Sequence, residues 1–240
     1  MRTLALIPAK GRSRGLPGKN IAELGTHPLI AYSIAAGLQA THVDRVMVST
    51  DSEEIATIAR RYGAEVPFLR PAQFAADDTR DFDVYWHALQ WLEAHDAEVP
   101  DIIVQLRPTS PLRTAGLLDE AVKLLVENPD ADSVRSVCKP AQTPYKMWQP
   151  ADDGSVTPLL SVPGISECFN APRQRLPVVW WQTGAMDVFW PRTLRDKQSM
   201  TGTRVLPLEM PAEDVVDIDS LADLERAQLL LESGRWVCPQ

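Results

Sequence analysis

Short apolar segments alternate with segments of helical periodicity along the first half of the chain, and this alternation limits the possible folds more than any other feature. The apolar runs span 3–9, 45–50 and 101–106, and the helical segments span 28–39, 52–62, 82–94 and 115–127. Such alternation is typical of right-handed βαβ units with helices on both faces of a parallel sheet. The sequence therefore predicts an α/β fold with a mainly parallel sheet, and ligands are expected where the strands end at their carboxyl termini.

The pattern changes after a further strand expected at 133–138. Residues 139–177 contain seven prolines and little periodicity, yet they include aromatic side chains such as Tyr145 and Trp148. We interpret this segment as an excursion from one domain spanning 1–240, in contact with a partner subunit; a mobile surface loop is the alternative. Strands at 178–190 and 204–208 and a helix at 220–232 are expected to follow.

Charge is distributed unevenly along this acidic chain, which has a net charge of -8. Residues 1–22 contain no acidic side chain, whereas 205–225 contain no basic one. The net charge argues against a nucleic-acid or anionic-membrane partner, and the clustering suggests a polyanion site with a cation beside it. The three cysteines lack metal-ligand spacing, and no apolar run reaches the ~18 residues that span a bilayer, so a cytoplasmic protein is expected.

The segment after the first expected strand reads AKGRSRGLPGKN and combines three glycines with four basic residues. Glycines allow the backbone N–H groups to converge on an anion, and the cations supply the counter-charge, so the loop is suited to a triphosphate. A Walker A loop does not fit, because Ser13 replaces its first glycine and Asn20 its hydroxyl residue. A short-chain dehydrogenase loop does not fit either, because no tyrosine is followed by lysine four residues later.

Five motifs in one order together resemble the acylneuraminate cytidylyltransferases, which make CMP-sialic acid and its bacterial relatives. From residue 3 to about 231 they read IPAKGRSRGLPGKN, VSTDSEEIATIARRYGAEVPFLRPAQFAADDT, LRPTSPLRT, APRQRLP and VVDIDSLADLERA. The resemblance implies a Rossmann-like nucleotidyltransferase with a projecting dimerisation element, acting as a homodimer with Mg²⁺. It also implies transfer of CMP from CTP to the anomeric hydroxyl of an acidic 2-keto-3-deoxy sugar, with release of pyrophosphate.

The same resemblance assigns roles to individual residues. Nucleotide binding is expected from Lys10, Arg12, Ser13, Arg14, Lys19, Asn20, Arg70 and Thr79. Catalytic roles are expected for Lys19 and Arg14, which stabilise phosphate charge, and for Asp219, which helps to deprotonate the acceptor hydroxyl. Asp217 and Asp219 are the expected Mg²⁺ ligands, with Ile218 turned into the core between them. Asp219 as the N-cap of the last helix is an alternative, and Asp51 is interpreted as a helix cap.

Acceptor binding is expected from Arg107, Thr109, Ser110, Lys146, Arg173 and, on weaker grounds, Gln174. The sequence departs from the family pattern at three places. Arg12 stands in the basic loop where the family usually has glycine, Arg107 stands at the acceptor position where it often has glutamine, and Trp180–Trp181 replace part of a polar stretch. Arg107 suggests a more anionic or differently substituted acceptor than N-acetylneuraminate. A related nucleotidyltransferase with another acceptor or another NTP, or a non-catalytic nucleotide-binding relative, therefore remains open.

Overall fold

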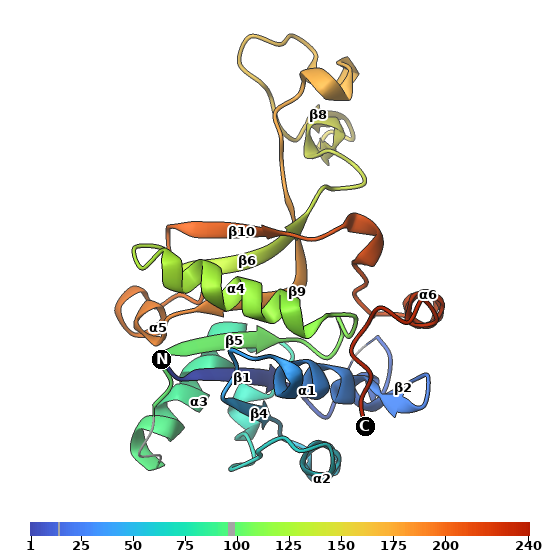
Figure 1. The fold of residues 1–240 in the computed structure, drawn as a ribbon. Coiled ribbons are helices and arrows are strands. Elements are labelled where there is room, and N and C mark those ends of the chain that lie inside the picture. The colour runs from blue at the N-terminus through green and yellow to red at the C-terminus, as the bar shows by residue number, and fades with distance from the viewer. Residues whose placement is uncertain (14, 96–98) are drawn as a thin grey trace.

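The computed structural model describes residues 1–13, 15–95 and 99–240, and a six-stranded sheet lies at its centre. The strands lie in the order β10-β6-β9-β5-β1-β4 (Figure 1). They span β1 Thr3–Pro8, β4 Arg45–Ser49, β5 Ile102–Leu106, β6 Ser133–Cys138, β9 Trp181–Phe189 and β10 Val205–Glu209. β1 is parallel to β4 and β5, and β10 is parallel to β6, whereas β9 is antiparallel to both of its neighbours. The predicted α/β fold with a mainly parallel sheet is confirmed.

Six α-helices accompany the sheet in the described residues. They span α1 Leu29–Gln39, α2 Glu53–Arg61, α3 Asp81–His95, α4 Ala115–Glu127, α5 Pro191–Lys197 and α6 Leu221–Leu231. Five match expected helices to within a residue or two; α5, which begins at Pro191 directly after β9, was not expected. No helix in the described part of the chain is long and apolar enough to cross a membrane.

Short elements complete the chain. The 3-10 helices are η1 Lys19–Ile21, η2 Ala72–Phe74, η3 Pro144–Lys146, η4 Cys168–Asn170, η5 Arg173–Arg175 and η6 Ala212–Asp214. Two small hairpins pair β2 Glu23–Leu24 with β3 His27–Pro28, and β7 Trp148–Pro150 with β8 Val156–Pro158. The first hairpin lies between the basic loop and α1, and the second belongs to the proline-rich segment.

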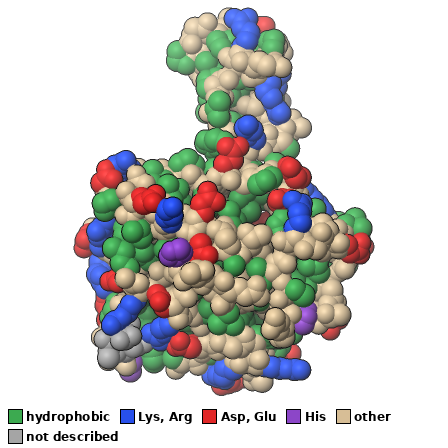
Figure 2. All heavy atoms as spheres, viewed as in Figure 1, with side chains coloured by type: hydrophobic (Ala, Val, Ile, Leu, Met, Phe, Trp, Pro, Cys, Tyr) green, Lys and Arg blue, Asp and Glu red, His purple; other side chains and the backbone are tan. Residues whose placement is uncertain are grey.

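The proline-rich segment leaves the sheet after β6 and returns in β9, and it projects far from the other elements (Figure 1). Its interior is small and includes the buried Cys168 and Thr143. Large apolar side chains remain exposed on it, among them Trp148, Val156 and Leu159, and Figure 2 shows hydrophobic groups over the visible face of this projection. Such exposure is more than a solvated segment needs.

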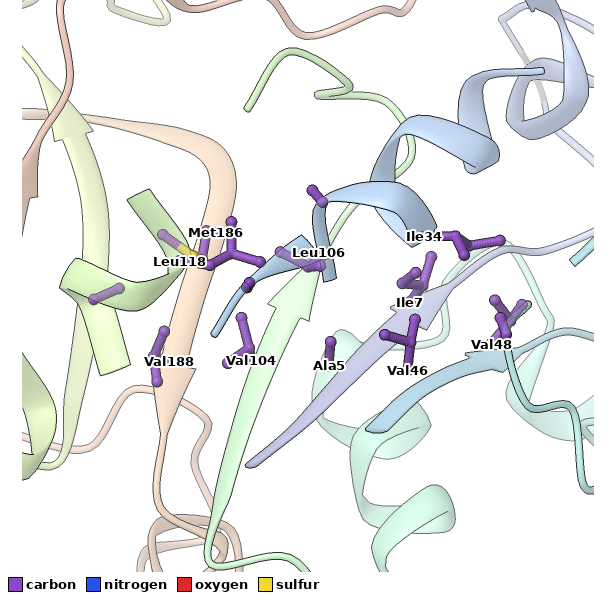
Figure 3. Close-up of a cluster of buried hydrophobic side chains, with 14 of the residues drawn as sticks. Ala5, Ile7, Ile34, Val46, Val48, Val104, Leu106, Leu118, Met186 and Val188 are labelled. Atoms are coloured by element: carbon purple, nitrogen blue, oxygen red, sulfur yellow. The ribbon is translucent and has the colours of Figure 1, made fainter. Parts of the chain in front are cut away.

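Two apolar clusters hold the helices on the sheet. On one face, side chains such as Ile7, Val104 and Met186 pack against Ile34 of α1 and Leu118 of α4 (Figure 3). On the other face, α3 and α5 cover a second cluster that includes Phe189. Because helices cover both faces of the sheet, the loops at the carboxyl ends of the parallel strands are the part left open. These loops carry the polar residues expected to bind ligands.

Candidate functional site

The loops that follow β1, β4 and β5 meet at the carboxyl ends of these parallel strands, as expected. Asp51, after β4, connects two of the segments there: its carboxylate accepts the Gly11 N–H at 2.8 Å and lies 3.8 Å from the Arg70 guanidinium. The interpretation of Asp51 as a helix cap is wrong, because the Ser52 hydroxyl accepts the Ile55 N–H as the N-cap of α2. The Asp51 carboxylate instead links the basic loop to Arg70.

A cavity of about 420 Å³ opens at these strand ends, and it gathers most of the expected nucleotide-binding residues. Its lining includes Lys10, Ser13, Lys19, Asn20, Arg70 and Thr79. Arg12 lies instead on an adjoining cavity of about 500 Å³, which shares Ser13 with the first. Arg14 lies outside the described residues. The basic loop thus borders both cavities, and its lysine and arginine side chains line space that an anion can enter.

Local backbone contacts shape the basic loop. Gly18 adopts a left-handed conformation, with φ of 64°, directly before Lys19. Asn20 is buried and donates its side-chain amide to the Lys10 carbonyl at 2.9 Å. Asn20 therefore closes the loop on itself.

The acidic segment approaches this loop from a position 200 residues further along the chain. The Lys19 ammonium lies 2.6 Å from an Asp219 carboxylate oxygen. The backbones also come close, because a Cβ placed on Gly15 would lie 2.7 Å from the Asp219 carbonyl oxygen. Glycine at position 15 permits this approach of two backbones.

The two acidic residues of this segment flank a core residue. Ile218 is fully buried and donates its N–H to the Thr109 carbonyl at 2.8 Å, which ties the segment to the loop after β5. Asp219 lines the cavity, whereas Asp217 does not and lies near Gly184. Ser220, not Asp219, is the N-cap of α6, so the alternative interpretation of Asp219 is wrong. The Asp219 side chain is therefore available to the cavity.

One wall of the cavity is formed by η2 and the residues around it. Arg70 is only 5% exposed; burial lowers its pKa, and the Asp51 carboxylate opposes this effect. Phe74 lines the cavity, and its ring packs on the His87 ring at a centroid distance of 4.8 Å. Arg70, Phe74 and Thr79 thus line the same part of the chain's main cavity.

The loop after β5 also contributes to the cavity lining. Arg107 and Thr109 line the cavity, and Ser110 is buried just behind it. Arg113 lies beneath this loop with no exposed surface, and its guanidinium donates to the Arg107 carbonyl and to the Ser33 hydroxyl. Burial lowers the pKa of Arg113 to about 9. This arginine braces the loop that presents Arg107.

Lys146, Arg173 and Gln174 do not join the cavity of their own chain. All three lie in the projecting segment, in or beside η3 and η5. Arg173 donates to the Ala141 carbonyl at 2.6 Å, a contact within that segment. Their expected role in acceptor binding therefore remains a prediction.

Sequence reasoning missed two carboxylates of this site. Asp77 lies 2.9 Å from the Lys10 ammonium, and Asp81 lies 2.5 Å from the Arg107 guanidinium. Both line the cavity. Asp81 directly precedes the expected helix and resembles an ordinary capping residue. Asp77 belongs to the quoted motif that ends at Thr79, but its pairing with Lys10 could not be inferred from the sequence.

Comparison with known proteins places this site in a family. A sequence model described as cytidylyltransferase matches residues 4–150, which is more than half of the chain. The chain belongs to the cytidylyltransferase family. It is 32% identical over 229 residues to the N-acylneuraminate cytidylyltransferase of Escherichia coli O18:K1:H7, with 95% of this chain and 52% of that protein covered.

Other members of the family are matched along different lengths. This cytidylyltransferase family member is 40% identical over 124 residues to the CMP-N,N'-diacetyllegionaminic acid synthase of Legionella pneumophila, covering 52% of this chain and 53% of that protein. It is 30% identical over 230 residues to the post-translational flagellin modification protein B of Campylobacter coli, covering 95% of this chain and 94% of that protein. The chain thus spans about half the length of the first relative and nearly all of the third, and the match to the second covers about half of each protein.

A solved structure shows the same fold. CMP:2-keto-3-deoxy-manno-octonic acid synthetase complexed with CTP matches with a TM-score of 0.71 at 15% identity, covering 98% of this chain and 100% of that one. At this identity the likeness concerns the fold alone. It confirms the predicted type of nucleotidyltransferase fold.

Proposed function

We propose that this protein transfers CMP from CTP to the anomeric hydroxyl of an acidic 2-keto-3-deoxy sugar and releases pyrophosphate. The observation that carries the proposal is the contact of Lys19 with Asp219 at 2.6 Å, which brings the basic loop and the acidic segment to one cavity. A phosphoryl transfer needs cations around the phosphates and a carboxylate near the attacking hydroxyl. Family membership supports the same reaction.

In this proposal the basic loop holds the triphosphate. Lys10, Ser13 and Lys19 donate to phosphate oxygens, and Arg12 and Arg14 add positive charge from the same loop. Asn20 holds the loop around the phosphates through its bond to the Lys10 carbonyl. Arg70, buried with its Nε unpaired among the described residues, faces the base together with Thr79. A guanidinium suits the acceptor atoms O2 and N3 of cytosine, which favours CTP over other nucleotides.

The chemical step joins the acceptor oxygen to the α-phosphorus. The anomeric O–H loses its proton toward the Asp219 carboxylate, a new P–O bond forms, and the bond to the β-phosphate oxygen breaks as pyrophosphate leaves. Lys19 stabilises the negative charge that grows on the phosphates. Arg107, Thr109 and Ser110 bind the acceptor beside this point.

Of the two expected Mg²⁺ ligands, Asp219 lines the cavity and would hold the ion there, whereas Asp217 lies outside the lining and remains a prediction as the second ligand. The described residues contain no cluster of three or more metal-binding side chains, but a magnesium ion shared with substrate phosphates needs only one or two carboxylates. The exposed Asp219 carboxylate at the cavity fits that donor set. When bound, the ion would neutralise phosphate charge.

The test of the function is direct. The protein is incubated with CTP, Mg²⁺ and a panel of nonulosonic and octulosonic acids, and pyrophosphate release is measured. Release with at least one acid is expected, with CTP preferred among the four nucleotides. Absence of release with every acid would reject the reaction, and CTP binding without release would indicate a non-catalytic relative.

The metal assignment has its own test. Asp219→Asn keeps the shape of the side chain but removes its charge, so turnover should fall by about 10²-fold and recover in part at high Mg²⁺. Lys19→Ala should also lose turnover, but added Mg²⁺ should not restore it, because a donor fixed in the loop is missing. Normal turnover of Asp219→Asn at low Mg²⁺ would refute the assignment.

We also propose that the protein is a homodimer formed through the projecting segment, 139–177. Exposed apolar side chains on this segment, such as Trp148 and Leu159, need a second surface to bury them. In the dimer, Lys146, Arg173 and Gln174 reach the partner's cavity and bind the acidic acceptor. Light scattering should show a dimer that Leu159→Asp weakens; a fully active monomer at nanomolar concentration would contradict this.

A further inference from the structure

The acceptor side of the cavity contains an ion pair between two loops. The Arg107 Nη2 lies 2.5 Å from an Asp81 carboxylate oxygen, and both residues line the cavity. Their side chains keep 33% and 49% of their surface exposed. Arg107 follows β5 and Asp81 is the first residue of α3, so the pair joins two elements at the mouth of the site.

Carboxylates surround this arginine on more than one side. Burial acts to lower the pKa of Arg107, but Asp81, then Tyr85, Asp187 and Asp217, act to raise it, and the pKa is raised on balance. Arg135 binds Asp187 through two hydrogen bonds of 2.8 and 2.9 Å, so that carboxylate has a second cation. The contact with Asp81 therefore offsets part of the charge of Arg107 and weakens its attraction for a further anion.

The other end of the guanidinium, Nη1, lies close to Gly184. A Cβ placed on Gly184 would lie 3.8 Å from the Arg107 Nη1, 3.9 Å from an Asp217 carboxylate oxygen and 4.0 Å from the Ser110 hydroxyl. This hydroxyl is buried and has no hydrogen-bond partner in the described part of the chain. Polar atoms from three segments thus converge beside the ion pair.

We propose that Arg107 and Asp81 together recognise two neighbouring neutral polar groups on the acceptor sugar. An arginine and a carboxylate in contact present a donor and an acceptor side by side. Of two adjacent hydroxyls, one can accept a hydrogen bond from Arg107 while the other donates to Asp81; an acylamino N–H next to a hydroxyl can also donate to Asp81. Both hydrogen bonds are strengthened because the protein group is charged. Arg107 alone suggested a more anionic or differently substituted acceptor; its pairing with Asp81 favours the second of these. The inference rests on the proposed function and adds the class of acceptor.

Acceptor kinetics test the inference. Wild-type protein is assayed with acids that carry both neighbouring groups, with deoxy analogues that lack one of them, and with phosphorylated acids. Loss of either group should raise the acceptor KM by about tenfold or more, because a charged group then loses its partner. Phosphorylated acids should be poor acceptors. Equal use of deoxy and complete acids, or preference for phosphorylated ones, would overturn the inference.

Asp81→Asn provides the decisive variant. It should raise the KM for the neutral acceptor by about tenfold, leave the KM for CTP within about twofold, and improve the use of phosphorylated acids, since Arg107 regains its uncompensated charge. Asp83→Asn is the matched control: it removes the same charge two residues away, where Asp83 pairs with Arg80 at 2.9 Å. It should change none of these values.

The outcomes separate the two proposals. If the wild-type protein releases no pyrophosphate with any acid, the proposed function fails. If it turns over but Asp81→Asn and Asp83→Asn behave alike, the function stands and the role of the Arg107–Asp81 pair is refuted.

Discussion

Gly15 offers a test of how closely the two walls of the site must approach. A methyl group on this residue would lie 2.7 Å from the Asp219 carbonyl oxygen, whereas ordinary contacts begin at 3.4 Å. In Gly15→Ala the basic loop and the acidic segment must therefore separate by roughly 0.7 Å. A misplacement of about 1 Å can cost about 10²-fold in rate, so kcat/KM should fall by roughly 10- to 100-fold.

The assay compares pyrophosphate release with the free energy of unfolding for the same variant. The crowding at Gly15 should lower the free energy of unfolding by about 1–3 kcal/mol, which leaves the protein folded, so the loss of rate is measured on native protein. Gly116→Ala is the control, because Gly116 lies in α4 with nothing within 4 Å of an added Cβ. It should keep wild-type activity. Wild-type kcat/KM in Gly15→Ala would refute the argument.

Three further predictions concern stability. Burial, and then the charge of Arg70, lower the pKa of His87 in the folded protein. The unfolded chain therefore binds a proton at His87 more readily than the folded protein, so His87 should lower the stability of the fold as pH falls below about 6.5. In His87→Gln the free energy of unfolding should depend less steeply on pH in this range. An unchanged pH dependence would contradict the prediction. Leu118→Ala should cost about 2–5 kcal/mol in chemical denaturation, because this side chain is fully buried between α4 and the sheet. Ser220→Ala should lower the free energy of unfolding by about 0.5–2 kcal/mol in the same measurement, because it removes the capping box of α6. An unchanged free energy of unfolding would argue against this role of Ser220.

The regular elements could be predicted because each has a local pattern. The buried strands appeared as apolar runs and the amphipathic helices as periodic segments, so the mainly parallel sheet followed from the alternation, whereas the order of its strands was not predicted. α5 was missed because its seven residues, Pro191–Lys197, are too few to establish a period next to an apolar strand. The β7–β8 hairpin was missed because its exposed strands lack alternation.

The site was predictable to the extent that its residues form motifs. Lys10, Lys19 and Asn20 belong to one loop and were found together. Asp51 was misread, because a carboxylate before a helix has the same appearance in sequence whether it caps that helix or accepts a distant N–H. Asp81 could not be assigned, because its partner Arg107 comes from another loop and only the folded chain brings the two together.

The projecting segment also explains the direction of β9. Among the described strands of the six-stranded sheet, β9 alone runs against its neighbours, and it pairs directly with β6, the strand from which the segment departs. The two strands and the 42 residues between them therefore have the connectivity of a very long hairpin, with no crossover. Because the entropy of closing a loop grows only slowly with its length, this connection can lengthen, shorten or change sequence without altering the strand order. Surfaces on the projection can diverge while the cavity at the other strands keeps its geometry.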